Sequence, residues 1–107
     1  MKEWDVEYSG PAEEDIDSIF CYIAITLQAP QAAKGQINRI IYEASKLDTM
    51  PERYPYLEKK KWKESALRRM NVDKYAVLYI ADRETGAVSI TRVLYGGQDI
   101  DEALLSE

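Results

Sequence analysis

The chain contains no histidine, and this absence limits the chemistry that it can perform. Histidine commonly binds transition metals, and it is the usual general base near neutral pH. Cys21 is the single cysteine, which excludes an internal disulfide and favours a reducing compartment. We therefore expect no metal and no cofactor, and any catalysis would depend on Lys, Arg, Tyr, Asp or Glu side chains.

The sequence also lacks any apolar run of about 18 residues, the length that a membrane-spanning helix needs. Its first ten residues, MKEWDVEYSG, have neither the basic start nor the apolar core of a signal peptide. There is no low-complexity tract and no internal repeat. We expect a cytoplasmic protein without a membrane partner, in which residues 1–107 form a single domain.

The net charge of -5 is unevenly distributed along the chain. Residues 58–74 include seven basic and three acidic residues, a local charge of +4, so the remainder carries -9. A basic segment of this kind is either a solvated charge run or a surface for nucleic acid or another target. The candidate contact residues in it are Lys59, Lys61, Lys63 and Arg68.

Hydrophobic spacing predicts the order strand, helix, helix, three strands and a short terminal helix. The expected strands are residues 4–8, 66–72, 74–81 and 87–95, with a turn at 82–86. The first expected helix follows Pro11 and ends by Ala29, and the second begins at Pro30. A short last helix is expected to start after a cap at Asp99. We expect a two-layer α+β domain in which an antiparallel helical hairpin packs on an antiparallel sheet.

Arg92 is anomalous within the last predicted strand. Strict alternation places it in phase with Val88, Ile90 and Leu94. A buried guanidinium without a partner costs several kcal/mol. Either a helix carboxylate pairs with Arg92, or that face of the sheet opens into a groove that uses the charge.

Three segments of the chain, together with the proline break between the two predicted helices, are similar to segments of a known protein family. They are YSGPAEEDIDSIFCYI, LRRMNVDKYAVLYIAD and VSITRVLYGGQDIDEAL. In this order they resemble the RelE/ParE family of bacterial type II toxins over almost the whole chain. The resemblance implies the family's two-layer fold and a cytoplasmic toxin that a cognate antitoxin binds and neutralises. It also implies that operator DNA is contacted only through the antitoxin complex.

The family has two branches that differ in their action. RelE-like members cut messenger RNA on the ribosome, whereas ParE-like members, linked to plasmid stabilisation, poison DNA gyrase. RNA-cleaving members commonly carry an arginine before an LVY pattern, and the matching position in KYAVLYIA is Ala76. ParE-like members commonly show a polar residue and an Arg-Asp pair after RV, where this chain has Tyr95 and then Gln98 and Asp99. The resemblance is closer to the ParE-like branch, with DNA gyrase as the expected target.

The resemblance implies that Arg92 faces a groove of the sheet, which would explain why it alternates in phase with apolar side chains. If the chain cuts RNA, its catalytic candidates are Arg92, Tyr95 and Arg69. Arg68 and Arg69 lie on opposite faces of one strand, so at most one of them shares a side with Arg92.

Three functions remain open at this point. The chain is expected to be a gyrase inhibitor, a ribosome-dependent endoribonuclease, or an inactive homologue that serves as an antitoxin-binding co-repressor. The acidic remainder of the chain predicts an antitoxin that is less acidic than most, and the sequence does not indicate which residues bind it.

Overall fold

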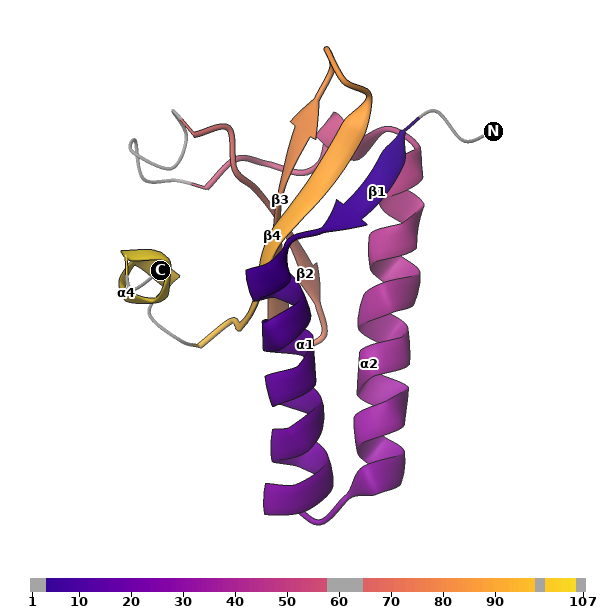
Figure 1. The fold of residues 1–107 in the computed structure, drawn as a ribbon, viewed down its shortest axis with the longest axis vertical. Coiled ribbons are helices and arrows are strands. Elements are labelled where there is room, and N and C mark those ends of the chain that lie inside the picture. The colour runs from indigo at the N-terminus through magenta and orange to yellow at the C-terminus, as the bar shows by residue number, and fades with distance from the viewer. Residues whose placement is uncertain (1–3, 58–64, 98–99, 106–107) are drawn as a thin grey trace.

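The computed structural model describes residues 4–57, 65–97 and 100–105. Two long helices lie together on one side of a four-stranded sheet (Figure 1), which confirms the expected α+β class. The strands are β1 (Asp5–Tyr8), β2 (Arg68–Val72), β3 (Tyr75–Asp82) and β4 (Ala87–Tyr95). The helices are α1 (Gly10–Cys21), α2 (Pro30–Ser45) and the short α4 (Ile100–Leu105).

The sheet has the strand order β1-β4-β3-β2 and is mixed. Strands β3 and β4 pair antiparallel, as expected from the turn at residues 82–86, and β2 also pairs antiparallel with β3. Strand β1 instead runs parallel to β4, from the pair Asp5 and Ala87 to the pair Tyr8 and Ile90. The expectation of an antiparallel sheet is therefore wrong for β1. The alternation within residues 4–8 shows which face is buried, but it does not show which strand is the partner or in which direction it runs.

The helical hairpin forms where the sequence predicts it. Ser9 caps α1, because its hydroxyl accepts a hydrogen bond from the backbone N–H of Ala12 at 3.1 Å. Helix α1 continues into the π-helical segment Tyr22–Thr26, and α2 begins at Pro30. The helical spacing of Ile16, Ile19, Phe20, Ile23 and Leu27 predicts one buried stripe on the first helix. Leu27 is instead exposed, in the connection between the helices.

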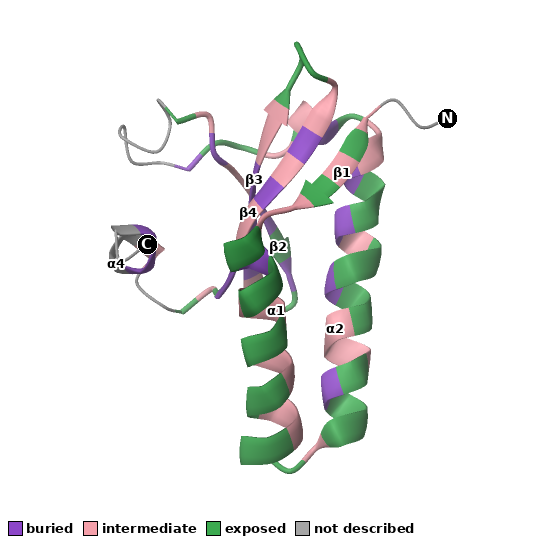
Figure 2. Cartoon of the chain, in the orientation of Figure 1, coloured by how far each residue is buried: buried purple, intermediate pink, exposed green. Residues whose placement is uncertain are grey.

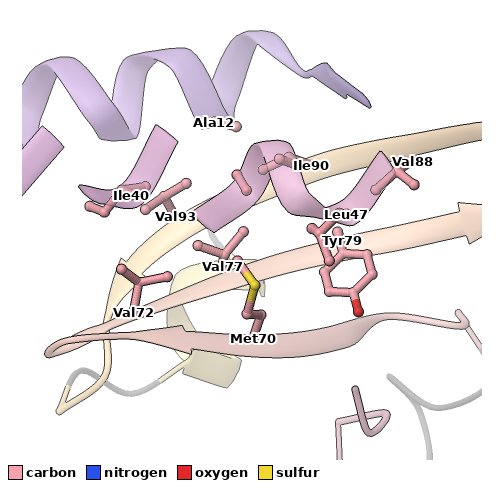
Figure 3. Close-up of a cluster of buried hydrophobic side chains, with 11 residues drawn as sticks. Ala12, Ile40, Leu47, Met70, Val72, Val77, Tyr79, Val88, Ile90 and Val93 are labelled. Carbon is pink, nitrogen blue, oxygen red and sulfur yellow. The ribbon is translucent and has the colours of Figure 1, made fainter. Parts of the chain in front are cut away.

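The main hydrophobic core lies between the helical hairpin and the sheet (Figures 2 and 3). Both helices, the 3₁₀ turn after α2 and strands β2 to β4 contribute apolar side chains to it. Its members are Ala12, Ile40, Ala44, Leu47, Met70, Val72, Val77, Tyr79, Val88, Ile90 and Val93. This is the packing expected for a hairpin that covers one face of a sheet.

A second, smaller apolar cluster lies on the opposite face of the sheet. It combines side chains of β3, β4 and α4 with two residues that flank the undescribed segment 58–64. Its members are Leu57, Leu67, Ala76, Leu78, Leu94, Ala103 and Leu104. Helix α4 therefore covers part of the face that the hairpin leaves open. The predicted cap of this helix, Asp99, lies outside the described residues.

Tyr79 gives the core a dependence on alkaline pH. Its side chain is fully buried, and its hydroxyl donates a hydrogen bond to the carbonyl of Pro51 at 2.6 Å. Burial raises the pKa of Tyr79 to about 12. The folded state thus favours the neutral phenol, so its contribution to stability is complete below the unfolded pKa of about 10 and is lost as the pH rises towards 12.

We therefore expect the free energy of unfolding, measured by denaturant titration, to fall steeply between pH values of about 10 and about 12. The fall should be shallower in Tyr79→Phe, which has no phenol to ionise. Tyr42→Phe is the matched control, since Tyr42 is exposed, and it should keep the slope of the unaltered chain. Equal slopes in Tyr79→Phe and the unaltered chain would contradict this account.

Candidate functional site

A bulge in β4 decides the direction in which Arg92 points. Leu78 of β3 pairs with Arg92, and the next residue, Tyr79, pairs with Ile90, so Thr91 is an extra residue in β4. Ile90 belongs to the core beneath the helices, whereas Leu78 belongs to the cluster on the opposite face. Because paired residues on neighbouring strands point to the same face, Arg92 lies on the face of Leu78, opposite the helices. The expectation that Arg92 is in phase with Ile90 is wrong, because one inserted residue reverses the alternation.

Arg92 forms an ion pair with Asp15 of α1. Its Nε donates to Asp15 Oδ2 at 2.7 Å and its Nη2 to Asp15 Oδ1 at 2.8 Å, and each side chain is only 14% exposed. Asp15 Oδ2 also accepts from the backbone N–H of Val93 at 2.9 Å. Arg92 Nη1 donates to the carbonyl of Ala103 in α4 at 3.3 Å. The structure therefore shows the first of the two explanations for Arg92, pairing with a carboxylate from a helix. Through its contacts Arg92 connects α1, β4 and α4.

Arg69 lies on the same face of the sheet as Arg92. Leu78 pairs with Arg69 on one side and with Arg92 on the other, which places the three side chains in one row across β2, β3 and β4. Arg69 Nε donates to Asn71 Oδ1 at 2.9 Å. The Arg69 guanidinium reaches the end of β4, where its Nη2 would lie 3.4 Å from a Cβ added at Gly96.

Arg68 lies on the other face of β2, as the alternation predicts, and it holds the preceding loop. Its Nη1 donates to the carbonyls of Glu52 at 3.0 Å and Tyr54 at 2.7 Å. Its guanidinium lies 4.0 Å from the ring centre of Tyr56, and its Nη2 donates to the Tyr56 hydroxyl at 2.9 Å. These contacts give Arg68 a structural role in residues 52–56.

Tyr95 is separated from Arg92 by the sheet. It pairs with Tyr75, and the two rings meet edge to face with centroids 6.0 Å apart. Tyr75 packs against the core beneath the helices, so Tyr95 lies on the helical side, where it is 50% exposed. The structure thus brings Arg69 and Arg92 to one face and leaves Tyr95 on the other.

A family model describing the ParE toxin of the type II toxin-antitoxin system parDE matches residues 6–100. The chain belongs to the ParE toxin family. It is a type II toxin of the wider RelE/ParE group, as the sequence resemblance predicts.

Solved structures of toxin-antitoxin systems share the fold of this ParE-family toxin. The chromosomal ParDE system of P. aeruginosa matches with a TM-score of 0.71 and 13% identity, covering 87% of this chain and 96% of that one. The RelBE2 complex of Mycobacterium tuberculosis matches with a TM-score of 0.62 and 19% identity, covering 87% and 98%. The RelE-RelB complex of Pyrococcus horikoshii matches with a TM-score of 0.58 and 16% identity, covering 90% and 98%. The comparison with curated protein sequences gave no match.

Three of the predicted candidate residues are not placed, and the described residues form neither a metal site nor a membrane span. Lys59, Lys61 and Lys63 lie outside the described residues. Within residues 4–57, 65–97 and 100–105, no three His, Cys, Asp or Glu side chains are grouped to hold a metal ion. In that same part of the chain, no helix is both long enough and apolar enough to cross a bilayer. Of the predicted candidates that the structure describes, Arg69 and Arg92 are the two that lie in one row on one face of the sheet.

Asp15 is the residue of this site that sequence reasoning missed. It follows Ala12 by three residues and precedes Ile16, so helical spacing places its carboxylate beside the inward stripe of α1. An acidic side chain next to an apolar stripe is a signal for a buried cationic partner. The sequence contains that signal, but it does not identify a partner 77 positions away.

Proposed function

We propose that this ParE-family toxin acts as a ParE-like inhibitor of DNA gyrase, is neutralised by a cognate antitoxin, and does not cut RNA. The observation that carries the proposal is that the three candidate groups for RNA cleavage do not converge, since only Arg69 and Arg92 share a face of the sheet. Cleavage through a 2′-hydroxyl needs a base, an acid and a group that stabilises the charge of the phosphorane. Arg92 is paired with Asp15, and Tyr95 lies on the opposite face of the sheet.

Two further features support a non-enzymatic toxin. The position that matches the arginine of RNA-cleaving relatives is Ala76, which is fully buried under α4 and offers no functional group. The chain also has no histidine to act as an acid or a base. Because the matched structures from M. tuberculosis and P. horikoshii are complexes of toxins with antitoxins, we extend the same kind of partner to this chain in the cytoplasm.

The test is induction of the toxin without antitoxin, with plasmid supercoiling and messenger RNA integrity scored in the same cells. We expect loss of supercoiling, intact transcripts, and equal toxicity of Tyr95→Phe and the unaltered chain. Codon-phased transcript cuts would instead make the chain a ribonuclease. In that case Tyr95→Phe should lower the cleavage rate by about 100-fold or more if Tyr95 is an acid or a base. Normal growth would favour the inactive co-repressor.

A further inference from the structure

Two side chains flank the glycine pair that follows β4. On the face opposite the helices, a Cβ added at Gly96 would lie 3.4 Å from Arg69 Nη2, so the guanidinium lies against this residue. A Cβ added at Gly97 would lie only 2.7 Å from Cε2 of Tyr95, closer than the roughly 3.5 Å at which unbonded carbon atoms meet. The Tyr95 ring therefore lies over the Gly97 backbone, and a side chain at position 97 would displace it. We call Arg69, Tyr95 and the neighbouring Lys74 the strand-end site.

The Tyr95 ring is held in place and is still open to solvent. Tyr75 meets it edge to face with the ring centroids 6.0 Å apart, and Gly97 lies against it as well. Tyr95 is nevertheless 50% exposed. An exposed aromatic ring whose position is already fixed is suited to stacking against the base of a nucleic acid.

Arg69 carries a positive charge that the described residues do not neutralise. In residues 4–57, 65–97 and 100–105 its guanidinium donates one hydrogen bond, from Nε to Asn71 Oδ1 at 2.9 Å, and pairs with no carboxylate. Arg92 differs from it, because Asp15 accepts two hydrogen bonds from the Arg92 guanidinium. A half-buried guanidinium without a carboxylate is suited to an anionic ligand such as a phosphate.

Lys74 adds a second positive charge at this end of the sheet. Its carbonyl accepts a hydrogen bond from the backbone N–H of Gly96 at 2.7 Å, which holds the turn between β2 and β3 against the end of β4. Lys74 is exposed, and the acidic residue of the same turn, Asp73, is paired with Arg39 at 2.8 Å. The strand-end site is thus locally positive in a chain whose net charge is -5.

We propose that the strand-end site binds a single strand of DNA. One base stacks on the Tyr95 ring, while phosphates of the same strand lie against Arg69 and Lys74. Because Gly96 and Gly97 are consecutive, their Cα atoms are about 3.8 Å apart, so one strand that crosses the end of β4 meets both flanking side chains.

The separation of Tyr95 from Arg69 by the sheet does not oppose this role. Cleavage of RNA requires an acid, a base and a stabilising group to converge on one phosphate. Binding requires only that successive parts of one strand meet an aromatic ring and a positive charge. The arrangement that argues against a ribonuclease is therefore compatible with a strand-binding surface.

The contacts of the strand-end site distinguish a single strand from other anionic ligands. A duplex keeps its bases stacked on one another and offers no free base to Tyr95. An acidic polypeptide would neutralise Arg69 and Lys74 but has no base for the fixed ring. RNA offers the same bases and phosphates, so the choice of DNA rests on the proposed function, in which the target enzyme acts on DNA.

The first test is the fluorescence anisotropy of a labelled thymidine oligomer of about 12 nucleotides, titrated with the purified full chain. We expect Tyr95→Ala to weaken binding by about 10-fold, the loss of one stacked base, and Tyr95→Phe, which keeps the ring, to stay within about three-fold. The matched control is Tyr42→Ala on α2, where Tyr42 is 62% exposed, and it should leave the affinity unchanged. Unchanged binding of Tyr95→Ala, or an equal loss in the control, would overturn the proposal.

A third variant tests the position of the ring without removing it. Gly97→Ala places a methyl group where Tyr95 Cε2 lies and should also weaken binding. The thermal unfolding midpoints of Tyr95→Ala and Gly97→Ala are measured alongside, so that a loss of binding is not a loss of the fold. Full affinity in a folded Gly97→Ala chain would contradict the stacking position.

The second test addresses the phosphate contacts through their salt dependence. Arg69→Gln should reduce the slope of log affinity against log salt by about 0.7, as for one phosphate of a single strand, and Arg69→Lys should keep the slope. Arg83→Gln removes the same charge in the turn between β3 and β4, at the opposite end of these strands (Figure 1), and should also keep it. Equal slopes in Arg69→Gln and the unaltered chain would exclude the Arg69 contact.

Competing ligands identify the class of partner. The thymidine oligomer should bind more tightly than a duplex of equal length, and equal or weaker binding would overturn the stacking contact. Polyglutamate that displaces the oligomer as well as unlabelled oligomer does would indicate a surface for acidic protein instead. Binding of a uridine oligomer without binding of the thymidine oligomer would overturn the assignment to DNA.

The induction assay keeps this inference separate from the proposed function. Transcript cuts without loss of supercoiling would refute the proposed function, and the anisotropy results would still decide whether the strand-end site binds DNA. Loss of supercoiling together with no binding of the thymidine oligomer would refute this inference and leave the proposed function standing.

Discussion

Replacing Asp15 with alanine is expected to lower the free energy of unfolding by about 3 kcal/mol, the lower end of the cost of breaking a buried ion pair, because Asp15 and Arg92 are largely rather than fully buried. Asp15 accepts two short hydrogen bonds from the Arg92 guanidinium and a third from the backbone N–H of Val93, and the side chains of Asp15 and Arg92 are each 14% exposed. The alanine variant takes this carboxylate away while the guanidinium stays between α1 and α4. Denaturant titration followed by circular dichroism measures the change.

The control for this prediction is Asp17→Ala, on the exposed side of the same helix. It should change the free energy of unfolding by about 0.5 kcal/mol or less. A second comparison is the double variant Asp15→Leu with Arg92→Met, in which apolar side chains replace both charges and should recover part of the lost stability. If Asp15→Ala is as stable as Asp17→Ala, the ion pair does not hold α1 to β4.

The second large effect is expected for Ile40→Ala. Ile40 is fully buried on α2 between the helices and the sheet, so its truncation leaves a cavity and should cost about 2 to 5 kcal/mol. Its neighbour provides a matched control, because Ile41 is exposed on the same helix. Ile41→Ala should change stability by about 0.5 kcal/mol or less, measured by the same titration.

These two adjacent isoleucines test the face of α2 that packs on the sheet. Equal losses at Ile40 and Ile41, or a larger loss at Ile41, would mean that α2 is rotated relative to the sheet.

The helical hairpin and the last two strands were predictable because their signals are local. The change from period-two to helical spacing after Pro11, and the break before Pro30, depend on residues a few positions apart. The predicted apolar stripe of the first helix extends too far at its end, since Leu27 lies in the connection between the helices and is exposed. Family membership was likewise predictable, because it depends on a series of short segments in order.

The candidate site was less predictable because it depends on register. Arg69 and Arg92 share a face only because Leu78 pairs with both of them, and Arg92 points to that face only because Thr91 is an extra residue in β4. The separation of Arg92 from Tyr95 is visible in the sequence, since residues three positions apart in a strand face opposite sides. The partner of Arg92 is not visible, since no local pattern connects it to Asp15.

The sequence by itself determined the order of the elements, the two-layer class, the family and the absence of histidine chemistry. The tertiary structure alone decided that β1 runs parallel to β4, that Thr91 is bulged and that Asp15 pairs with Arg92. The physical reason is that hydrophobic periodicity arises from neighbours along one helix or strand. Strand direction, register and ion pairing arise instead from residues far apart in the chain, which meet only when the hairpin packs on the sheet.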